Sequence, residues 1–344
     1  MMLSEFIYYL GYSIKKRYSL KNQKRLPFKV ISIGNITVGG TGKTPAAIAV
    51  AEEAEKRGLN PVILTRGYRG KAKGPCFVIS SQLSAFSGQQ KNLSLLYGDE
   101  PVLMAERLKD VPVVKCADRY EGGMFALQSL SSPNSPVVFI LDDGFQHWKL
   151  HRDVNIVLVN GQDPYGNRKL LPLGPLRGPL PELKRADMFV VTNSPEGERS
   201  PDATSALVSE LNRYNPAAPV FFSEHRLTGI RVGNGSRFET DSLKDKRVYA
   251  FCGLANPESF RQTVQSLGCD IGGFKAYRDH HKYSKDDMSY LEAQAKTLKC
   301  DFLITTEKDM VKLGEMKVPE NLLCAEISFH TDAAFFDQVF SCIP

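Results

Sequence analysis

The chain reads Phe28-Lys-Val-Ile-Ser-Ile-Gly-Asn-Ile-Thr-Val-Gly-Gly-Thr-Gly-Lys-Thr-Pro45 near its start. The β-branched run at 30–33 favours a buried parallel strand. Three glycines follow, and because they carry no Cβ, successive backbone N–H groups can curl around a phosphate at the start of the next helix. Residues 46–51 are small and apolar, which suits a helix lying on a sheet. The stretch therefore predicts a strand, a phosphate-binding loop and a helix.

The chemistry of this loop lies in its last residues. Lys43 can place a positive charge on the outer phosphates of a nucleotide, and the Thr44 hydroxyl can bind Mg²⁺. The usual pattern G-x-x-x-x-G-K-[ST] has glycine where this chain has Thr37, but its second half is intact. A plain strand-to-helix turn would need the glycines and the Lys-Thr pair by coincidence. We therefore expect a nucleotide to bind Gly39, Gly40, Thr41, Gly42, Lys43 and Thr44.

Further apolar runs alternate with helical patterns along the chain. They lie at 61–66, 111–115, 136–143, 156–159 and 188–192. Strand, helix and strand in this order give right-handed parallel crossovers. The sequence thus predicts a P-loop NTPase-type α/β/α sandwich over 26–220.

The composition changes near residue 225, and 247–253 opens a second βαβ pattern. We therefore expect a second, smaller α/β domain over 221–330, with a strand linker, and a C-terminal helix over 331–344. The strand expected at 322–328 can return to pair with the strand near 220. A cleft between the two domains is the natural place for two substrates.

Acidic residues stand at two informative positions. Asp142 and Asp143 end the apolar run at 136–143, and ligands of such a sheet bind at the carboxyl ends of its strands. This position favours one of the two as a partner of Mg²⁺ beside the phosphate loop. Asp99 stands in the turn Gly98-Asp-Glu-Pro101 before a helical pattern, where capping of the helix alone would explain a carboxylate.

The first 25 residues combine an apolar, aromatic segment with six basic residues against the single acid Glu5. The apolar part is too short to span a bilayer, and no cleavage site for a signal peptide follows it. The pattern fits an interfacial helix with a basic tail over 1–25, lying on anionic lipid. A helix packed on the core of the protein is the alternative from these residues alone.

The remaining composition is that of an ordinary globular protein, with 42% hydrophobic and 24% charged residues and a net charge of +6. Seven cysteines are scattered without metal-site spacing, which indicates free thiols and a reducing compartment.

Six motifs occur together in a fixed order: 37–45, 98–101, 141–147, the Leu-Pro-Leu-Gly-Pro-Leu-Arg loop at 171–177, Asp-His-His-x-Tyr at 279–283 and Thr-Glu-Lys-Asp at 306–309. Together they resemble the tetraacyldisaccharide 4'-kinase family of lipid A biosynthesis. That family has threonine at the place of the missing glycine. Gly178 departs from the family, which often has glutamate there, and this puts a role for that carboxylate in doubt.

The resemblance implies transfer of the γ-phosphoryl group of ATP, with Mg²⁺, to the 4'-hydroxyl of a tetraacyldisaccharide 1-phosphate. It implies that Asp99 is the catalytic base and that His280, from the second domain, is its partner. Four residues are candidates for contacts with phosphate or sugar: Arg119, Gln146, His147 and Arg177. Glu307 and Lys308 are expected near the nucleotide with less support.

The resemblance also implies a place in the cell. A substrate with four acyl chains stays in the membrane, so we expect the protein at the cytoplasmic face of the inner membrane, bound through its N-terminal helix. The expected partners are the lipid substrate and that membrane surface, with no nucleic acid.

Two other functions remain alternatives from the residues themselves. P-loop ATPases of the partitioning or metal-carrier type share Gly-Gly-x-Gly-Lys-Thr, but they carry lysine where this chain has Val38. A nucleotide-regulated membrane-binding module without turnover is the second. A guanine-specific site is disfavoured because Lys308 stands one place late for Thr-Lys-x-Asp.

Overall fold

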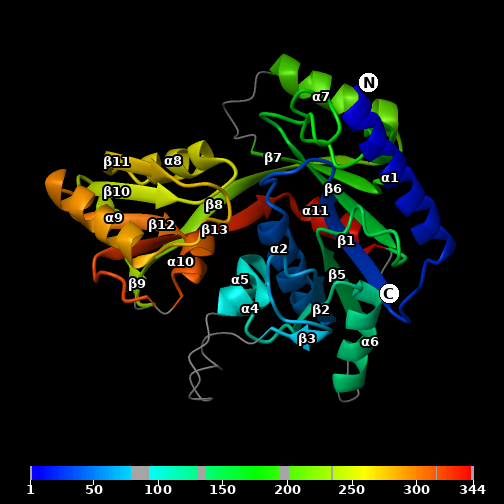
Figure 1. The fold of residues 1–344 in the computed structure, drawn as a ribbon, viewed down its shortest axis with the longest axis horizontal. Helices are drawn as coiled ribbons and strands as arrows, with labels where there is room; N and C mark the ends of the chain where they lie inside the picture. Colours follow the sequence, from blue (N-terminus) through cyan, green and yellow to red (C-terminus); the bar gives the residue numbers. More distant parts are fainter. Residues whose placement is uncertain are drawn as a thin grey trace.

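One β-sheet extends through the whole molecule. The computed structural model describes residues 2–78, 93–130, 136–193, 201–233, 235–314 and 316–341. Within them a 13-stranded sheet has the order β11-β10-β12-β13-β8-β7-β6-β1-β5-β2-β4-β3, with β9 pairing β8. Figure 1 shows two lobes, a larger one on the right and a smaller one on the left, with β8 and β13 passing between them.

The larger lobe is built on parallel strands. They are β1 (Lys29–Asn35), β2 (Asn60–Thr65), β4 (Val113–Lys115), β5 (Val137–Asp142), β6 (Val154–Asn160) and β7 (Met188–Thr192), and the short β3 (Cys76–Phe77) is antiparallel to β4. These strands are buried along nearly their whole length because helices cover both faces. The predicted α/β/α sandwich is confirmed.

Two layers of helices cover this sheet. On one face, α2 (Lys43–Lys56), α5 (Asp99–Arg107) and α11 (Ala333–Phe340) share a hydrophobic core with β1, β2 and β5. On the other face lie α6 (Arg119–Ser129), η2 (Leu180–Arg185) and α7 (Pro201–Tyr214). The short α4 (Leu93–Tyr97) precedes α5. The sequence also predicts a loop-rich insertion at 71–97, and its Ser/Gln-rich piece at 80–90 lies outside the described residues.

The smaller lobe repeats the same layering on a smaller scale. Its strands are β10 (Arg247–Cys252), β11 (Asp270–Ala276) and β12 (Phe302–Thr306). One face is covered by α8 (Pro257–Gln265), and the other by α9 (Lys285–Thr297) and α10 (Glu307–Leu313). The short β9 (Arg237–Phe238) and η3 (Thr240–Leu243) lie beside them.

Two long strands join the lobes. The first three residues of β8 (Val220–Val232) pair with β7, and from Ser223 onward it pairs antiparallel with β13 (Leu322–Thr331). The predicted return of the last strand is thus confirmed. The chain then re-enters the larger lobe, where Phe335 and Val339 of α11 are fully buried. The domain boundaries expected at 25, 220 and 330 stay a prediction.

The N-terminal helix α1 (Leu3–Lys21) has two different faces. The inner face packs on the larger lobe: the Tyr12 ring meets Trp148 edge-on at 5.0 Å, and the Tyr8 hydroxyl donates to the Arg177 carbonyl oxygen at 2.9 Å. The outer face leaves large apolar side chains exposed: Leu3, Phe6, Ile7, Leu10 and Ile14. The basic residues from 15 to 21, expected in a tail, belong to this helix.

Neither face makes α1 a membrane span. Among the helices in the described ranges, none is both long enough and apolar enough to cross a bilayer. The six cysteines within the described ranges are free thiols. The seventh, Cys342, lies outside those ranges.

Candidate active site

A cleft of about 1340 Å³ opens between the lobes. Its walls include the glycine loop, the carboxyl ends of β2 and β5, the start of α5 and the loop that follows β11. Parallel strands end at one edge of a sheet, and this topology explains why residues distant in the sequence meet there.

The glycine loop enters α2 through backbone that glycine favours. Gly42 is the N-cap of α2 with φ 77°, and Gly39 has φ 114°. A Cβ on Gly42 would lie 2.7 Å from Cε1 of His225. Both this close contact and the positive φ disfavour any other residue there. Lys43 Nζ lies 3.4 Å from Asn35 Oδ1 and 3.7 Å from Asp143 Oδ1. All six residues predicted to bind the nucleotide line the cleft.

The two acids at the carboxyl end of β5, its last residue Asp142 and the following Asp143, have opposite electrostatic environments. Asp142 accepts a hydrogen bond from Thr65 at 3.0 Å, yet burial, with the negative charges of Glu100 and Asp143, raises its pKa to about 7. Asp143 is paired with Arg177, whose Nη1 lies 2.7 and 2.8 Å from its two carboxylate oxygens. Burial opposes ionisation of Asp143, but Lys43 and Arg177 outweigh it and lower its pKa.

The described side chains thus neutralise Asp143 but only partly offset the charge of Asp142. They include no group of three or more His, Cys, Asp or Glu able to bind a metal by themselves. Thr44 lines the same cleft.

Asp99 and His280 meet across the cleft. His280 Nδ1 lies 2.9 Å from Asp99 Oδ2 and 3.2 Å from Oδ1. The N-cap of α5 is Gly98 and Asp99 is the first helical residue, so the interpretation of Asp99 as a cap is wrong. Burial opposes ionisation of Asp99, but the hydrogen bond from His280 and the charge of Lys308 lower its pKa to about 2. Asp99 is thus a carboxylate at neutral pH.

The loop after β11 holds His280 in place. His280 has φ 58°, a strained conformation for a residue with a side chain, and its backbone N–H donates to Asp279 at 2.9 Å. From the larger lobe, Arg69 Nη1 donates to the His280 carbonyl oxygen at 3.2 Å. The neighbouring His281 stacks on Tyr277 at 4.3 Å, within the smaller lobe.

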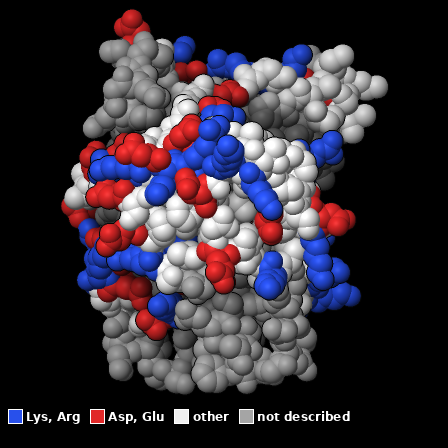
Figure 2. Space-filling view, turned by 90° about the vertical axis from the view of Figure 1, so that its left-hand side faces the viewer, with Lys and Arg blue, Asp and Glu red and all other residues white. Residues whose placement is uncertain are grey.

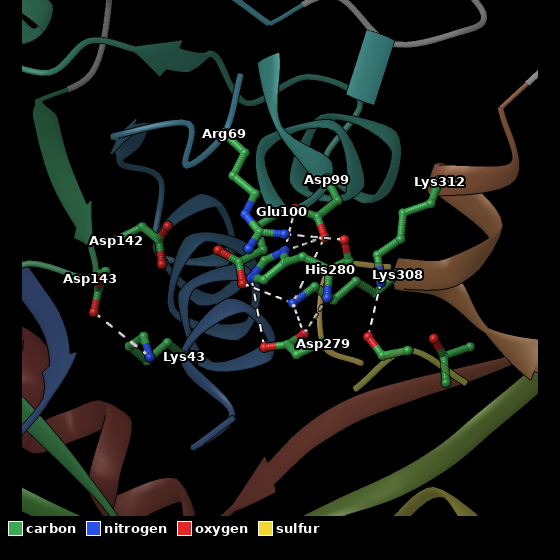
Figure 3. A network of polar contacts seen from close by, with 12 residues as sticks. Lys43, Arg69, Asp99, Glu100, Asp142, Asp143, Asp279, His280, Lys308 and Lys312 are labelled. Carbon is green, nitrogen blue, oxygen red and sulfur yellow. Dashed lines mark hydrogen bonds and ion pairs between the residues drawn. The ribbon is translucent and has the colours of Figure 1, made fainter. Parts of the chain in front are cut away.

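Lys308 and Glu307 begin α10 and both line the cleft. Lys308 Nζ lies 3.2 Å from Glu100, 3.4 Å from Asp279 and 3.8 Å from Asp99. In Figure 3 these side chains gather at the centre, and the Lys43–Asp143 pair lies to one side. Glu307 pairs with Arg107 of α5 at 3.1 Å, and burial raises its pKa to about 7.

The predicted substrate residues line the cleft as well. Arg119 is buried with Nη1 on the Ala117 carbonyl oxygen, and burial lowers its pKa. Gln146 donates to the Asn35 carbonyl oxygen at 2.7 Å. Burial and the charge of Arg119 lower the pKa of His147 to about 3, and its Nε2 has no partner among the described residues. Arg177 is already engaged by Asp143.

Sequence reasoning missed three residues of this site: Thr65, Arg69 and Glu100. Thr65 stands within the apolar run at 61–66, as the last residue of β2, and Arg69 follows that run, so their place at the carboxyl end of a strand was a usable signal. Glu100 stands beside Asp99 in the same short motif. Its neighbours Asp142 and Lys308 come from distant parts of the chain, which local patterns do not relate.

The outer surface of the smaller lobe carries charges of both signs. Figure 2 shows Lys and Arg side chains interspersed with Asp and Glu on this face, among its described residues. Charges of both signs on one face produce no strong field of a single sign.

Comparison with known proteins identifies the family. The family model described as tetraacyldisaccharide-1-P 4'-kinase matches residues 2–343. The chain belongs to this family. It is therefore an enzyme, a kinase of lipid A biosynthesis, and the resemblance inferred from six motifs is confirmed.

Individual members agree with the family model. The tetraacyldisaccharide 4'-kinase of Syntrophus aciditrophicus is 39% identical over 298 residues, covering 85% of this chain and 77% of the relative. That of Aquifex aeolicus is 37% identical over 293 residues, covering 84% and 81%. The crystal structure of Aquifex aeolicus LpxK in complex with ATP has a TM-score of 0.71 at 30% identity, covering 98% of this chain and 96% of that one.

Proposed function

We propose that this kinase transfers the γ-phosphoryl group of ATP to the 4'-hydroxyl of its lipid disaccharide with Asp99 as general base. The observation that carries the proposal is the contact of Asp99 with His280 across a cleft that also holds the phosphate loop. A sugar hydroxyl is a poor nucleophile and needs a positioned group to take its proton during the transfer. Asp99, ionised at neutral pH, accepts that proton, and His280 orients and stabilises the carboxylate.

The phosphate side of the reaction belongs to the larger lobe. The loop from Gly39 to Thr44 holds the phosphates of ATP, with Lys43 against the outer ones. The residues fit a bound Mg²⁺: Asp142 with the hydroxyl of Thr44 would hold it, and Asp143 stays with Lys43 and Arg177. Bound there, Mg²⁺ would neutralise phosphate charge during the transfer.

Two residues that line the cleft support the acceptor side of the reaction. Arg119 and the neutral His147 both have nitrogen atoms buried without a protein partner among the described residues. Such atoms are ready to bind the oxygen atoms of a sugar or its phosphate. Gln146 and Arg177 also line the cleft.

Access to the substrate is the role of α1. Its exposed apolar face and its basic residues are suited to lie in the headgroup region of an anionic bilayer. We place the enzyme at the cytoplasmic face of the inner membrane, where its lipid substrate stays.

The test uses ATP labelled in its γ-phosphoryl group, Mg²⁺ and disaccharide 1-phosphate in detergent. Label should move to the lipid with the wild-type protein and fall at least about 100-fold with Asp99→Asn, His280→Ala or Lys43→Ala. His281→Ala is the matched control, since the His281 side chain packs within the smaller lobe, and it should keep most activity.

Thermal melting shows whether each variant is folded. Asp99→Asn and His280→Ala should still bind ATP, because neither belongs to the phosphate loop. A folded Asp99→Asn protein with wild-type transfer would remove the base from this proposal. Label released as phosphate at the same rate with and without lipid would favour an ATPase instead.

A further inference from the structure

Carboxylates from both lobes converge on one ammonium group. Asp99 and Glu100 come from α5 of the larger lobe, and Asp279 comes from the loop after β11 in the smaller lobe. Lys308 Nζ lies within 4 Å of all three, at 3.8, 3.2 and 3.4 Å. Figure 3 shows these side chains turned toward Lys308 and His280.

Lys308 is held in a fixed position, and its ammonium group is largely buried. Its side chain is 17% exposed, and burying an ammonium group is unfavourable unless acids neutralise it. Thr306 caps α10 by accepting from the backbone N–H of Asp309 at 3.1 Å, which fixes the turn that carries Lys308. Burial opposes the charge, but Glu100, Asp99 and Asp279 outweigh it and raise the pKa of Lys308. The ammonium is thus a fixed positive charge.

We propose that Lys308 is a positioning residue for catalysis, whose ammonium holds Asp99 and the loop of His280 in the geometry that lets Asp99 take the acceptor proton. This inference rests on the proposed function of Asp99 and goes beyond it.

Lys308 acts on the two partners by separate contacts. Its charge attracts Asp99 directly and keeps that carboxylate ionised. It also binds Asp279, whose Oδ1 accepts from the His280 backbone N–H and so supports the strained backbone at His280. One side chain therefore orients both members of the pair and ties α10 to α5.

Direct binding of Lys308 to a phosphate of ATP is the competing role, and kinetics separate the two. If Lys308 bound a phosphate, replacing it would raise KM for ATP strongly. If Lys308 positions the catalytic pair, replacing it lowers kcat and leaves KM for ATP nearly unchanged, because the interaction serves the transition state.

The experiment compares Lys308→Met and Lys308→Arg with Lys285→Met, an exposed lysine at the start of α9 in the same lobe. Phosphoryl transfer to the lipid is measured against pH. Lys308→Met should lose about 100-fold in kcat, the size of effect expected when a reacting group is misplaced. Lys308→Arg should recover at least about 10-fold of that loss, and Lys285→Met should match the wild type.

The pH profile tests the mechanism itself. Asp99 is faced by His280, Lys308 and Lys312, with Glu100 next to it in the chain. Removing the charge of Lys308 raises the pKa of Asp99, so the acid limb of kcat/KM should move to higher pH in Lys308→Met. A residue that only joins the lobes would lower the rate without moving this limb.

Chemical rescue keeps the test decisive if Lys308→Met folds poorly. Ethylammonium added to Lys308→Ala should restore activity, whereas propanol of similar size should not. Wild-type kcat in Lys308→Met, an unmoved acid limb, or a loss confined to KM for ATP would each overturn the inference. These outcomes differ from failure of the proposed function, which full activity of Asp99→Asn would show.

Discussion

At the scale of the residue, the ionised form of Asp142 destabilises the folded protein at the active site. Burial and the neighbouring charges of Glu100 and Asp143 raise its pKa to about 7, well above the usual value for aspartate. The folded state therefore binds this proton more tightly than the unfolded chain does. It follows that the contribution of Asp142 to stability falls as pH rises from about 4 toward 7.

Asp142→Asn should consequently stabilise the protein at pH 8 without ligand, by at least about 1 kcal/mol. The same variant should lose most of the further stabilisation that ATP and Mg²⁺ give the wild type. Thermal melting with and without ATP and Mg²⁺ measures both effects. Asp143→Asn is the matched control with the opposite sign, because Lys43 and Arg177 lower the pKa of Asp143. A ligand-free Asp142→Asn protein that melts below the wild type would contradict this account.

The sequence indicated which residues lie in the cleft better than it indicated which side chains they contact. Gly42, Lys43 and the acids at the end of β5 line one cleft, as loop and strand patterns, which are local, led us to expect. The expectation for Lys308 was only partly informative: it lies in the cleft but binds carboxylates. Its three partners come from α5 and the loop after β11, and only the tertiary fold determines such a set.

At the scale of the element, α1 combines the two interpretations that its sequence left open. Side chains at 8, 12 and 19 face the larger lobe, and those at 3, 7, 10 and 14 are exposed. The exposed set recurs at three- and four-residue spacing and the set that faces the lobe at spacings of four and seven, so each forms a stripe along the helix. Because positions 6–10 are all apolar or aromatic, the sequence did not show which stripe would be buried.

The two stripes of α1 predict separable effects. Changing Ile7, Leu10 and Ile14 together to serine should weaken binding to vesicles rich in anionic lipid and leave the melting temperature nearly unchanged. Tyr12→Ala should instead release the helix from Trp148 and destabilise its docking by about 3 kcal/mol. Vesicle sedimentation and limited proteolysis of α1 measure the two outcomes. Equal vesicle binding by the triple variant and the wild type would remove the membrane role of this face.

At the scale of the whole molecule, the lobes share their strands. β8 pairs with β7 by its first residues and with β13 by the rest, and α11 returns to the larger lobe after β13. The change in composition near residue 225 was visible in the sequence. The return of the last strand to the strand near 220 was predicted too, but the continuity of the sheet was not, since it requires β8 to pair with β7 by its first residues and with β13 by the rest.

Shared strands should make the lobes unfold together. The single tryptophan, Trp148, is buried in the larger lobe, so its fluorescence follows that lobe, whereas far-ultraviolet circular dichroism follows both. The two signals should give coincident denaturation curves, as for a two-state transition.

Phe335→Ala, in the hydrophobic core that α11 shares with α2, should shift both curves equally, by about 3 to 5 kcal/mol. Asp337 lies on α11 like Phe335, but its side chain is exposed and pairs with Arg57. Asp337→Ala should therefore shift both curves by less than about 1 kcal/mol. A second phase seen by circular dichroism alone would mean that the smaller lobe unfolds by itself, and the strands β8 and β13 would then be a hinge between independent units.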